Sequence, residues 1–199
     1  MSPPPPNTSV RATILATGQE IMSRKGFSAV GLTELLKDAG VPKGSFYHYF
    51  ASKEAFGEAM LAAYFDGYLA EMDALVARSD LTGAARLIAY FAAWRDNQGA
   101  FDCQGRCLAV KLGAEVADLS EPMRLTLKTG TAEIIARMTR MIKDGVADRS
   151  LAVTGAAADL AASLYHLWVG ASVMAKIVKT HDPFDTSLRS TRQLLGLNG

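Results

Sequence analysis

Two cysteines lie four residues apart, at Cys103 and Cys107, and the chain has no other cysteine. Cys107 follows Arg106 and precedes Lys111 by four residues, near the expected start of a helix. Neighbouring cations and a helix N-terminus favour the thiolate form of cysteine, which attacks soft electrophiles and is readily oxidised. Cys107 is therefore a candidate reactive thiol, with an inert half-buried side chain as the alternative. Cys103 is either a resolving thiol or a bystander.

Patterns typical of enzymes and metal sites are not recognisable. The histidines stand at His48, His166 and His181, and no histidine near the cysteines completes a metal site. Neither a nucleophile–base arrangement nor a nucleotide-binding loop is recognisable. We expect no catalytic residue, no metal and no cofactor. An enzyme that uses Cys107 as its nucleophile remains an alternative.

A row of aromatic and imidazole side chains runs from Phe46 to Phe50 within the stretch GVPKGSFYHYF. Phe46 and Phe50 are four residues apart, so they would share the inner face of a short helix. The intervening Tyr47, His48 and Tyr49 carry donors and acceptors that suit phosphates and base edges. The row predicts a DNA contact. The alternative is that these side chains simply belong to the hydrophobic core and its rim.

Helical spacing runs through nearly the whole chain, which predicts an all-α fold. Two short helices, 32–39 and 43–50, flank a turn shaped by Gly40 and Pro42. This is the pattern of a helix-turn-helix, whose second helix can enter the major groove. The other helices are expected at about 8–25 (capped by Asn7 or Thr8), 52–78, 82–97, 105–118, 121–145, 154–180 and 183–197.

Composition limits the remaining possibilities. The chain has 199 residues and a net charge of +1, enough for one core or for a small head and a larger body. No uninterrupted apolar run approaches the roughly 18 residues of a membrane helix, and the N-terminus lacks a signal-sequence pattern. We expect a soluble, cytoplasmic protein without a membrane segment. Residues 1–6, rich in proline, are expected to form a disordered tail.

Residues 11 to 60, which contain RATILATGQEIMSRKGFSAVGLTELLKDAGVPKGSFYHYFASKEAF, resemble the DNA-binding domain of the TetR/AcrR family of transcriptional repressors. The resemblance implies a palindromic double-stranded DNA operator as partner. The short hydroxyl of Thr33 departs from the longer basic residue frequent in the family, so its reach to bases is smaller. Gly31 replaces a frequent threonine cap with little expected consequence. The implied DNA contacts are Thr33, Lys43, Gly44, Ser45, Tyr47, His48 and Tyr49, with Lys53 as a phosphate clamp.

The segments GRCLAVKLGAEVADLSEPMR (105–124) and LWVGASVMAKI (167–177) are similar to the electrophile-sensing members of this family. The resemblance implies that Cys107 reads reactive carbonyl, quinone or chlorine species. It also implies that Lys176 lies near the cysteine. From the residues alone, Lys176 has an equally good explanation as a lysine that snorkels from a helix end.

The body of the chain offers a dimer interface and a pocket. Residues 156–180 are apolar nearly all round, so the last two long helices are the expected homodimer interface, with a central core helix as the alternative. Aromatic and methionine side chains could instead line a reversible pocket for an apolar inducer. They are Trp94, Trp168, Tyr90, Phe91, Phe101, Met123, Met138, Met141, Tyr165 and His166, of which His166 is expected to be buried.

Together these observations predict a homodimeric repressor that leaves its operator when Cys107 is modified by an electrophile or oxidant. The expected division is a tail at 1–6, a helix-turn-helix DNA-binding domain at 7–52, and a helical regulatory and dimerisation domain at 53–199. A repressor induced by a reversibly bound apolar molecule is the first alternative. A thiol enzyme and a helical adaptor without DNA are the others.

Overall fold

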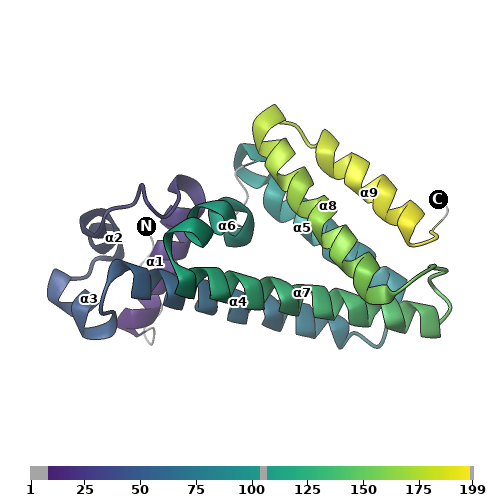
Figure 1. The fold of residues 1–199 in the computed structure, drawn as a ribbon, viewed down its shortest axis with the longest axis horizontal. Coiled ribbons are helices and arrows are strands. Elements are labelled where there is room, and N and C mark those ends of the chain that lie inside the picture. The colour runs from purple at the N-terminus through teal and green to yellow at the C-terminus, as the bar shows by residue number, and fades with distance from the viewer. Residues whose placement is uncertain (1–8, 104–106, 198–199) are drawn as a thin grey trace. The chain divides into compact units, whose positions relative to one another are not determined.

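The computed structural model describes residues 9–103 and 107–197, with the side chains of 98–103 left out. Within those residues the chain forms nine helices and no strand (Figure 1), which confirms the all-α class. The expected tail at 1–6 lies outside the described residues. The helices are α1 (Val10–Lys25), α2 (Leu32–Ala39), α3 (Lys43–Tyr49), α4 (Lys53–Val76), α5 (Gly83–Cys103), α6 (Leu108–Leu119), α7 (Glu121–Ala147), α8 (Ala157–Val178) and α9 (Asp182–Leu194).

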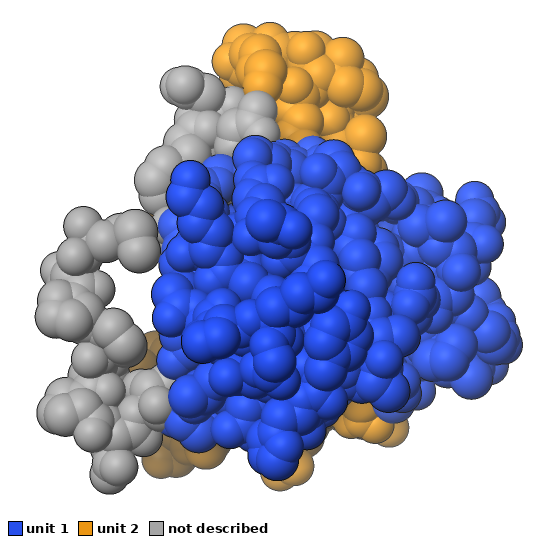
Figure 2. Space-filling view, turned by 90° about the vertical axis from the view of Figure 1, so that its left-hand side faces the viewer, with its two compact units in different colours: residues 1–67, 106–130 blue, residues 68–105, 131–199 orange. Residues whose placement is uncertain are grey.

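The chain divides into two compact units, coloured separately in Figure 2. The first unit comprises Met1–Gly67 and Arg106–Gly130, and the second comprises Tyr68–Gly105 and Thr131–Gly199. Helices α4 and α7 each contribute residues to both units. The functional division expected at residue 52 is a different kind of boundary, and it stays a prediction.

The first three helices begin and end at residues with clear local reasons. Ser9 caps α1, since its Oγ accepts the N–H of Ala12 at 3.2 Å, so the cap is neither Asn7 nor Thr8. Gly40 ends α2 with φ +66°, a left-handed conformation that favours glycine. Pro42 is the N-cap residue of α3, which ends at Tyr49 with Phe50 as its C-cap residue. The expected helix-turn-helix elements are therefore present.

An aromatic cluster of Phe46, Phe50 and Phe56 seats α3 in the first unit. The centroid of the Phe56 ring lies 5.7 Å from that of Phe46 and 5.2 Å from that of Phe50, and all three side chains are buried. Gly18 of α1 faces this cluster, because a Cβ there would lie only 2.4 Å from Phe56 Cζ. The inward faces of Phe46 and Phe50 are as predicted, and Phe56 of α4 is a partner that the sequence pattern did not indicate.

Two tryptophans form the centre of the second unit, where α8 packs against α5 and α9. The indole N–H of Trp94 donates to Ser172 Oγ, and that of Trp168 donates to Thr191 Oγ1, each at 2.9 Å. The ring of Trp168 also stacks on Phe91. This arrangement links α5, α8 and α9 through hydrogen-bonded core side chains.

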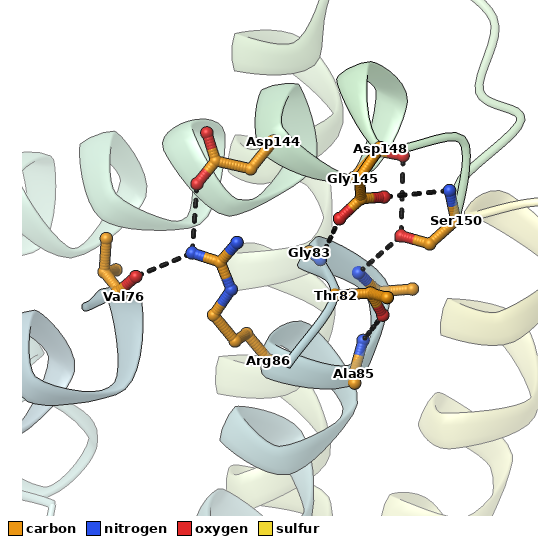
Figure 3. A network of polar contacts seen from close by, with 10 residues as sticks. Val76, Thr82, Gly83, Ala85, Arg86, Asp144, Gly145, Asp148 and Ser150 are labelled. Atoms are coloured by element: carbon orange, nitrogen blue, oxygen red, sulfur yellow. Dashed lines mark hydrogen bonds and ion pairs between the residues drawn. The ribbon is translucent and has the colours of Figure 1, made fainter. Parts of the chain in front are cut away.

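A polar network joins the start of α5 to the end of α7 and the residues that follow it (Figure 3). The N–H of Gly83 donates to Asp148 Oδ2 at 2.7 Å, and the N–H of Ala84 donates to Ser150 Oγ at 3.1 Å. These bonds satisfy amides that the first turn of α5 would otherwise leave unpaired. Arg86 adds a hydrogen bond to the Val76 carbonyl and an ion pair with Asp144.

Helix α8 is the one helix among the described residues that is long and apolar enough, by length and composition alone, to cross a membrane. The core helix of a globular protein passes the same test. The buried residues of α8, among them Leu164, Trp168 and Ala175, are those of a core helix. The composition of α8 therefore carries little weight as a sign of a membrane span.

Candidate nucleic-acid interface and sensor site

Helix α3 turns its polar and aromatic residues outward. Tyr47 is 54% exposed and Tyr49 is 39% exposed, while Lys43, Gly44 and His48 are also exposed. Ser45 is half-buried, and Thr33 is exposed on α2. Lys43 and Tyr47 share one stripe of the helix because they are four residues apart. The geometry leaves these side chains available to DNA, and the contacts themselves stay a prediction.

Two cations near this helix, Arg11 and Lys53, each lie over an aromatic ring. The guanidinium carbon of Arg11 lies 5.6 Å from the centroid of Phe50, which puts a cation that the sequence analysis missed beside the end of α3. The ammonium of Lys53 donates to the Phe27 carbonyl at 2.8 Å and sits 4.6 Å from the centroid of that ring. An ammonium has three donors, so Lys53 can keep its hydrogen bond to Phe27, in the loop between α1 and α2, and still bind a phosphate.

Cys107 is the N-cap residue of α6, as expected from its place at the start of a helical pattern. Its side chain is half-buried, and the hydroxyl of Tyr64 on α4 donates to Sγ at 3.5 Å. Both residues belong to the first unit. Tyr64 was not predicted, since nothing in the sequence relates it to a cysteine 43 residues away. Arg106, the other expected neighbour, lies outside the described residues.

The remaining sensor candidates lie elsewhere. Lys176 is half-buried on α8 in the second unit, so its pairing with a modified Cys107 stays a prediction. Cys103 ends α5, and its side chain lies outside the described residues. Of the described residues, none form a group of three or more histidine, cysteine or acidic side chains able to hold a metal ion.

Trp94 and Trp168 are buried core residues whose single N–H groups already donate to Ser172 and Thr191. An indole has one donor, so neither ring offers a spare hydrogen bond to a ligand. His166, expected to be buried, is instead exposed. That expectation is wrong because His166 falls on the outward stripe of α8, between the buried Tyr165 and Trp168.

Glu115 of α6 makes a long-range polar contact within the first unit. Its Oε2 accepts the N–H of Phe27 at 3.0 Å, and its Oε1 accepts the N–H of Ser28 at 2.6 Å. Burial on its own raises the pKa of Glu115, but the hydrogen bonds from Ser28 and Phe27, helped by the charge of Lys111, outweigh burial and lower the pKa overall. The carboxylate is therefore ionised at neutral pH and holds the loop between α1 and α2.

Protein-family comparisons match both parts of the chain. A family model described as bacterial regulatory proteins, tetR family, matches residues 14–60. A second, described as the tetracyclin repressor-like C-terminal domain, matches residues 83–191. The two matches together span both compact units.

Individual proteins show the same likeness. The chain is 38% identical to the HTH-type transcriptional repressor NemR of Escherichia coli (strain K12), over 93% of each chain. It is 33% identical to the transcriptional regulator AcuR of Cereibacter sphaeroides, over 89% of this chain and 81% of that protein. The crystal structure of the reduced form of E. coli NemR matches with a TM-score of 0.90 at 37% identity, covering 96% of this chain and 98% of that one.

Proposed function

Because the chain belongs to the TetR family of bacterial transcriptional regulators, we propose that it is a homodimeric repressor that leaves its operator when Cys107 is modified. A regulator acting on DNA is expected in the cytoplasm and needs no catalytic residues. The observation that carries the proposal is the place of Cys107, half-buried at the N-cap of α6 within hydrogen-bond reach of Tyr64.

DNA reading is assigned to the exposed side of α3. Lys43, Tyr47 and His48 would face the major groove, while Thr33 of α2 and the half-buried Ser45 would contribute shorter contacts. Gly44 and the N-terminal amides of α3 allow close approach to a phosphate. One helix-turn-helix reads few bases, so a palindromic operator and two copies of the chain about 34 Å apart are expected.

The partner copy is expected to pack on α8 and α9. The last turns of α8 expose Val173, Met174, Ile177 and Val178, and Leu194 is exposed on α9. Exposed apolar side chains of this kind are costly in water and typical of a surface that another subunit covers. This supports the predicted homodimer through the last two long helices.

The sensing chemistry requires only the thiol. The Cys107 thiolate adds to one carbon of an activated double bond, and the neighbouring carbon takes a proton from water. The adduct places new bulk at the N-cap of α6 and converts the sulfur that accepts the hydrogen bond of Tyr64 into a thioether. A hundredfold loss of operator affinity needs about 2.7 kcal/mol of coupling, within the usual range for allostery.

The test is operator binding by fluorescence anisotropy at fixed salt, before and after stoichiometric N-ethylmaleimide, with Cys107→Ser alongside. Loss of affinity in the wild type alone supports the thiol switch, and a Cys103→Ser protein with the wild-type response makes Cys103 a bystander. A Lys176→Ala protein with an altered response would implicate Lys176 in switching. Tight binding that N-ethylmaleimide leaves unchanged would refute the switch and favour a reversibly bound apolar inducer.

A further inference from the structure

Helix α6 carries both the candidate thiol and the residue that holds the loop of the DNA-reading helices. Cys107 is the N-cap residue of the helix, and Lys111 and Glu115 follow at intervals of four residues, so the three lie along one stripe. Eight residues of α-helix span about 12 Å. An unbroken helix of 12 residues therefore joins the thiol to the carboxylate, and a displacement of its first turn is carried along its length.

The loop after α1 fits closely around the Glu115 carboxylate. The amides of Phe27 and Ser28 donate to its two oxygens at 3.0 and 2.6 Å. Gly26 allows this approach, because a Cβ there would lie 2.9 Å from Oε2 and because its φ is +93°. These donors follow the end of α1 and have the carboxylate of α6 as their hydrogen-bond acceptor.

The other side of Phe27 is held by α4, the helix that follows α3. The Phe27 side chain is buried, and its carbonyl accepts a hydrogen bond from Lys53 at 2.8 Å. A Cβ on Gly57 would lie 2.7 Å from the Phe27 ring, so helix and ring are already in close contact. A shift of the 26–28 loop therefore reaches the start of α4 and the aromatic cluster that seats α3.

We infer that Glu115 is the positioning residue that couples helix α6 to the helix-turn-helix. The inference rests on the proposed function of Cys107 and extends it by naming the contact that transmits the modification. Modification of Cys107 displaces α6, the carboxylate releases the amides of Phe27 and Ser28, and the DNA-reading helices lose their fixed orientation. Without Glu115, the same contact is missing before any modification, so the variant should resemble the alkylated protein.

The experiment is amide hydrogen exchange at Phe27 and Ser28 in the full chain, before and after alkylation of Cys107 with N-ethylmaleimide. We expect exchange at both amides to become at least about tenfold faster after alkylation. Glu115→Gln should exchange fast before alkylation, bind operator at least about tenfold more weakly than wild type, and lose less than about a tenth as much further affinity on alkylation. Glu115→Asp, which keeps the charge but shortens the side chain, serves if the glutamine protein is poorly folded.

Asp118→Asn is the matched control, because it removes one exposed carboxylate from the same helix and should behave as wild type in every arm. Unchanged slow exchange in fully alkylated protein overturns the inference, as does a Glu115→Gln protein with a full response to alkylation. Faster amide exchange in the alkylated protein with unchanged operator affinity supports the contact between Glu115 and the 26–28 loop, but it refutes the proposed release of the operator. If Cys107 does not react with N-ethylmaleimide, the proposed switch fails. The inference about Glu115 is then judged on the Glu115→Gln protein alone. Slow amide exchange at Phe27 and Ser28 in that protein overturns the inference, and fast exchange supports it.

Discussion

Gly18→Ala tests how α3 is seated without changing any residue that is expected to face DNA. Gly18 lies in α1, and a Cβ at this position would lie 2.4 Å from Phe56 Cζ and 3.2 Å from Met60 Sδ. Carbon atoms pack at about 3.5–4.0 Å, so the added methyl group overlaps the ring by more than 1 Å. Phe56 is fully buried against Phe46 and Phe50, which leaves its ring no open side.

The expected cost combines two opposing effects. Overpacking a core costs about 1–3 kcal/mol, and the overlap at Gly18 places this variant in the upper half of that range. Replacing glycine with alanine inside a helix returns about 0.8–1.0 kcal/mol. The net loss is about 1–2 kcal/mol in the free energy of unfolding, which lowers Tm by roughly 2–8 °C in a chain of this size.

Thermal unfolding at one fixed protein concentration measures the effect, because a dimer's Tm depends on concentration. Gly67→Ala is the control, since a Cβ at Gly67 meets nothing within 4 Å and the variant should gain stability from helix propensity alone. Operator affinity should fall in Gly18→Ala, because a displaced Phe56 ring shifts Phe46 of α3 and Phe50 at its C-cap.

A second substitution separates overlap from other causes. Phe56→Leu removes ring atoms next to Gly18, so the two changes together should cost less than the sum of their separate costs by at least about 0.5 kcal/mol. A Gly18→Ala protein as stable as Gly67→Ala, or a double variant whose costs simply add, would show that the Phe56 ring has room to move. Either result refutes the reasoning.

Three further predictions follow from the same contacts. Gly83→Ala should lower the unfolding free energy by at least about 3 kcal/mol in denaturant titration, since its Cβ would lie 2.2 Å from the Gly145 backbone nitrogen and overlap main-chain atoms that cannot turn aside; a loss below about 1 kcal/mol would contradict this close approach. Because the pKa of Glu115 is lowered in the folded state, its contribution to stability is complete above the ordinary carboxyl pKa of about 4.3 and is lost as pH falls through the lower folded value. The stability difference between wild type and Glu115→Gln should therefore be constant from pH 7 to about 5.5 and shrink toward about pH 3, and a difference that grows on acidification would reverse the assigned direction. Lys43→Ala should weaken binding to specific and mismatched DNA alike and reduce the salt slope by about 1 per operator half-site, whereas an unchanged slope would remove Lys43 from the phosphate contacts.

Local signals predicted most element boundaries of this chain. Ser52 precedes α4 and its Oγ accepts the N–H of Ala55 at 3.1 Å, while Gly40 ends α2 as expected. Pro122 falls in the first turn of α7, where a missing N–H costs nothing. Helix α5 is the clearest miss, because it runs to Cys103 instead of ending near residue 97. Glycines stand at Gly99, inside the helix, and at Gly105, two residues past its end, so glycine positions alone did not say which of them ends the helix.

The exposed face of α3 and the position of Cys107 could be read from the sequence, because both depend on residues within one or two helical turns of each other. Helical periodicity reports which side of a helix is apolar and where its first amides lie. The family resemblance then supplied an expected role for those positions; the family matches confirm the family, and the roles stay predictions.

The partners of those residues were decided by tertiary packing. Tyr64 reaches Cys107 across 43 positions, and Glu115 reaches Phe27 across 88. Neither tyrosine nor glutamate differs locally from many other surface residues of an amphipathic helix. Which side chains meet depends on how helices pack, through close approaches such as Gly18 with Phe56. The sequence by itself determined the helices and the exposed face of α3 that is expected to meet DNA. Only the tertiary structure decided which side chain touches the thiol and which contacts connect its helix to the first helices, because long-range contacts leave no periodic trace along the chain.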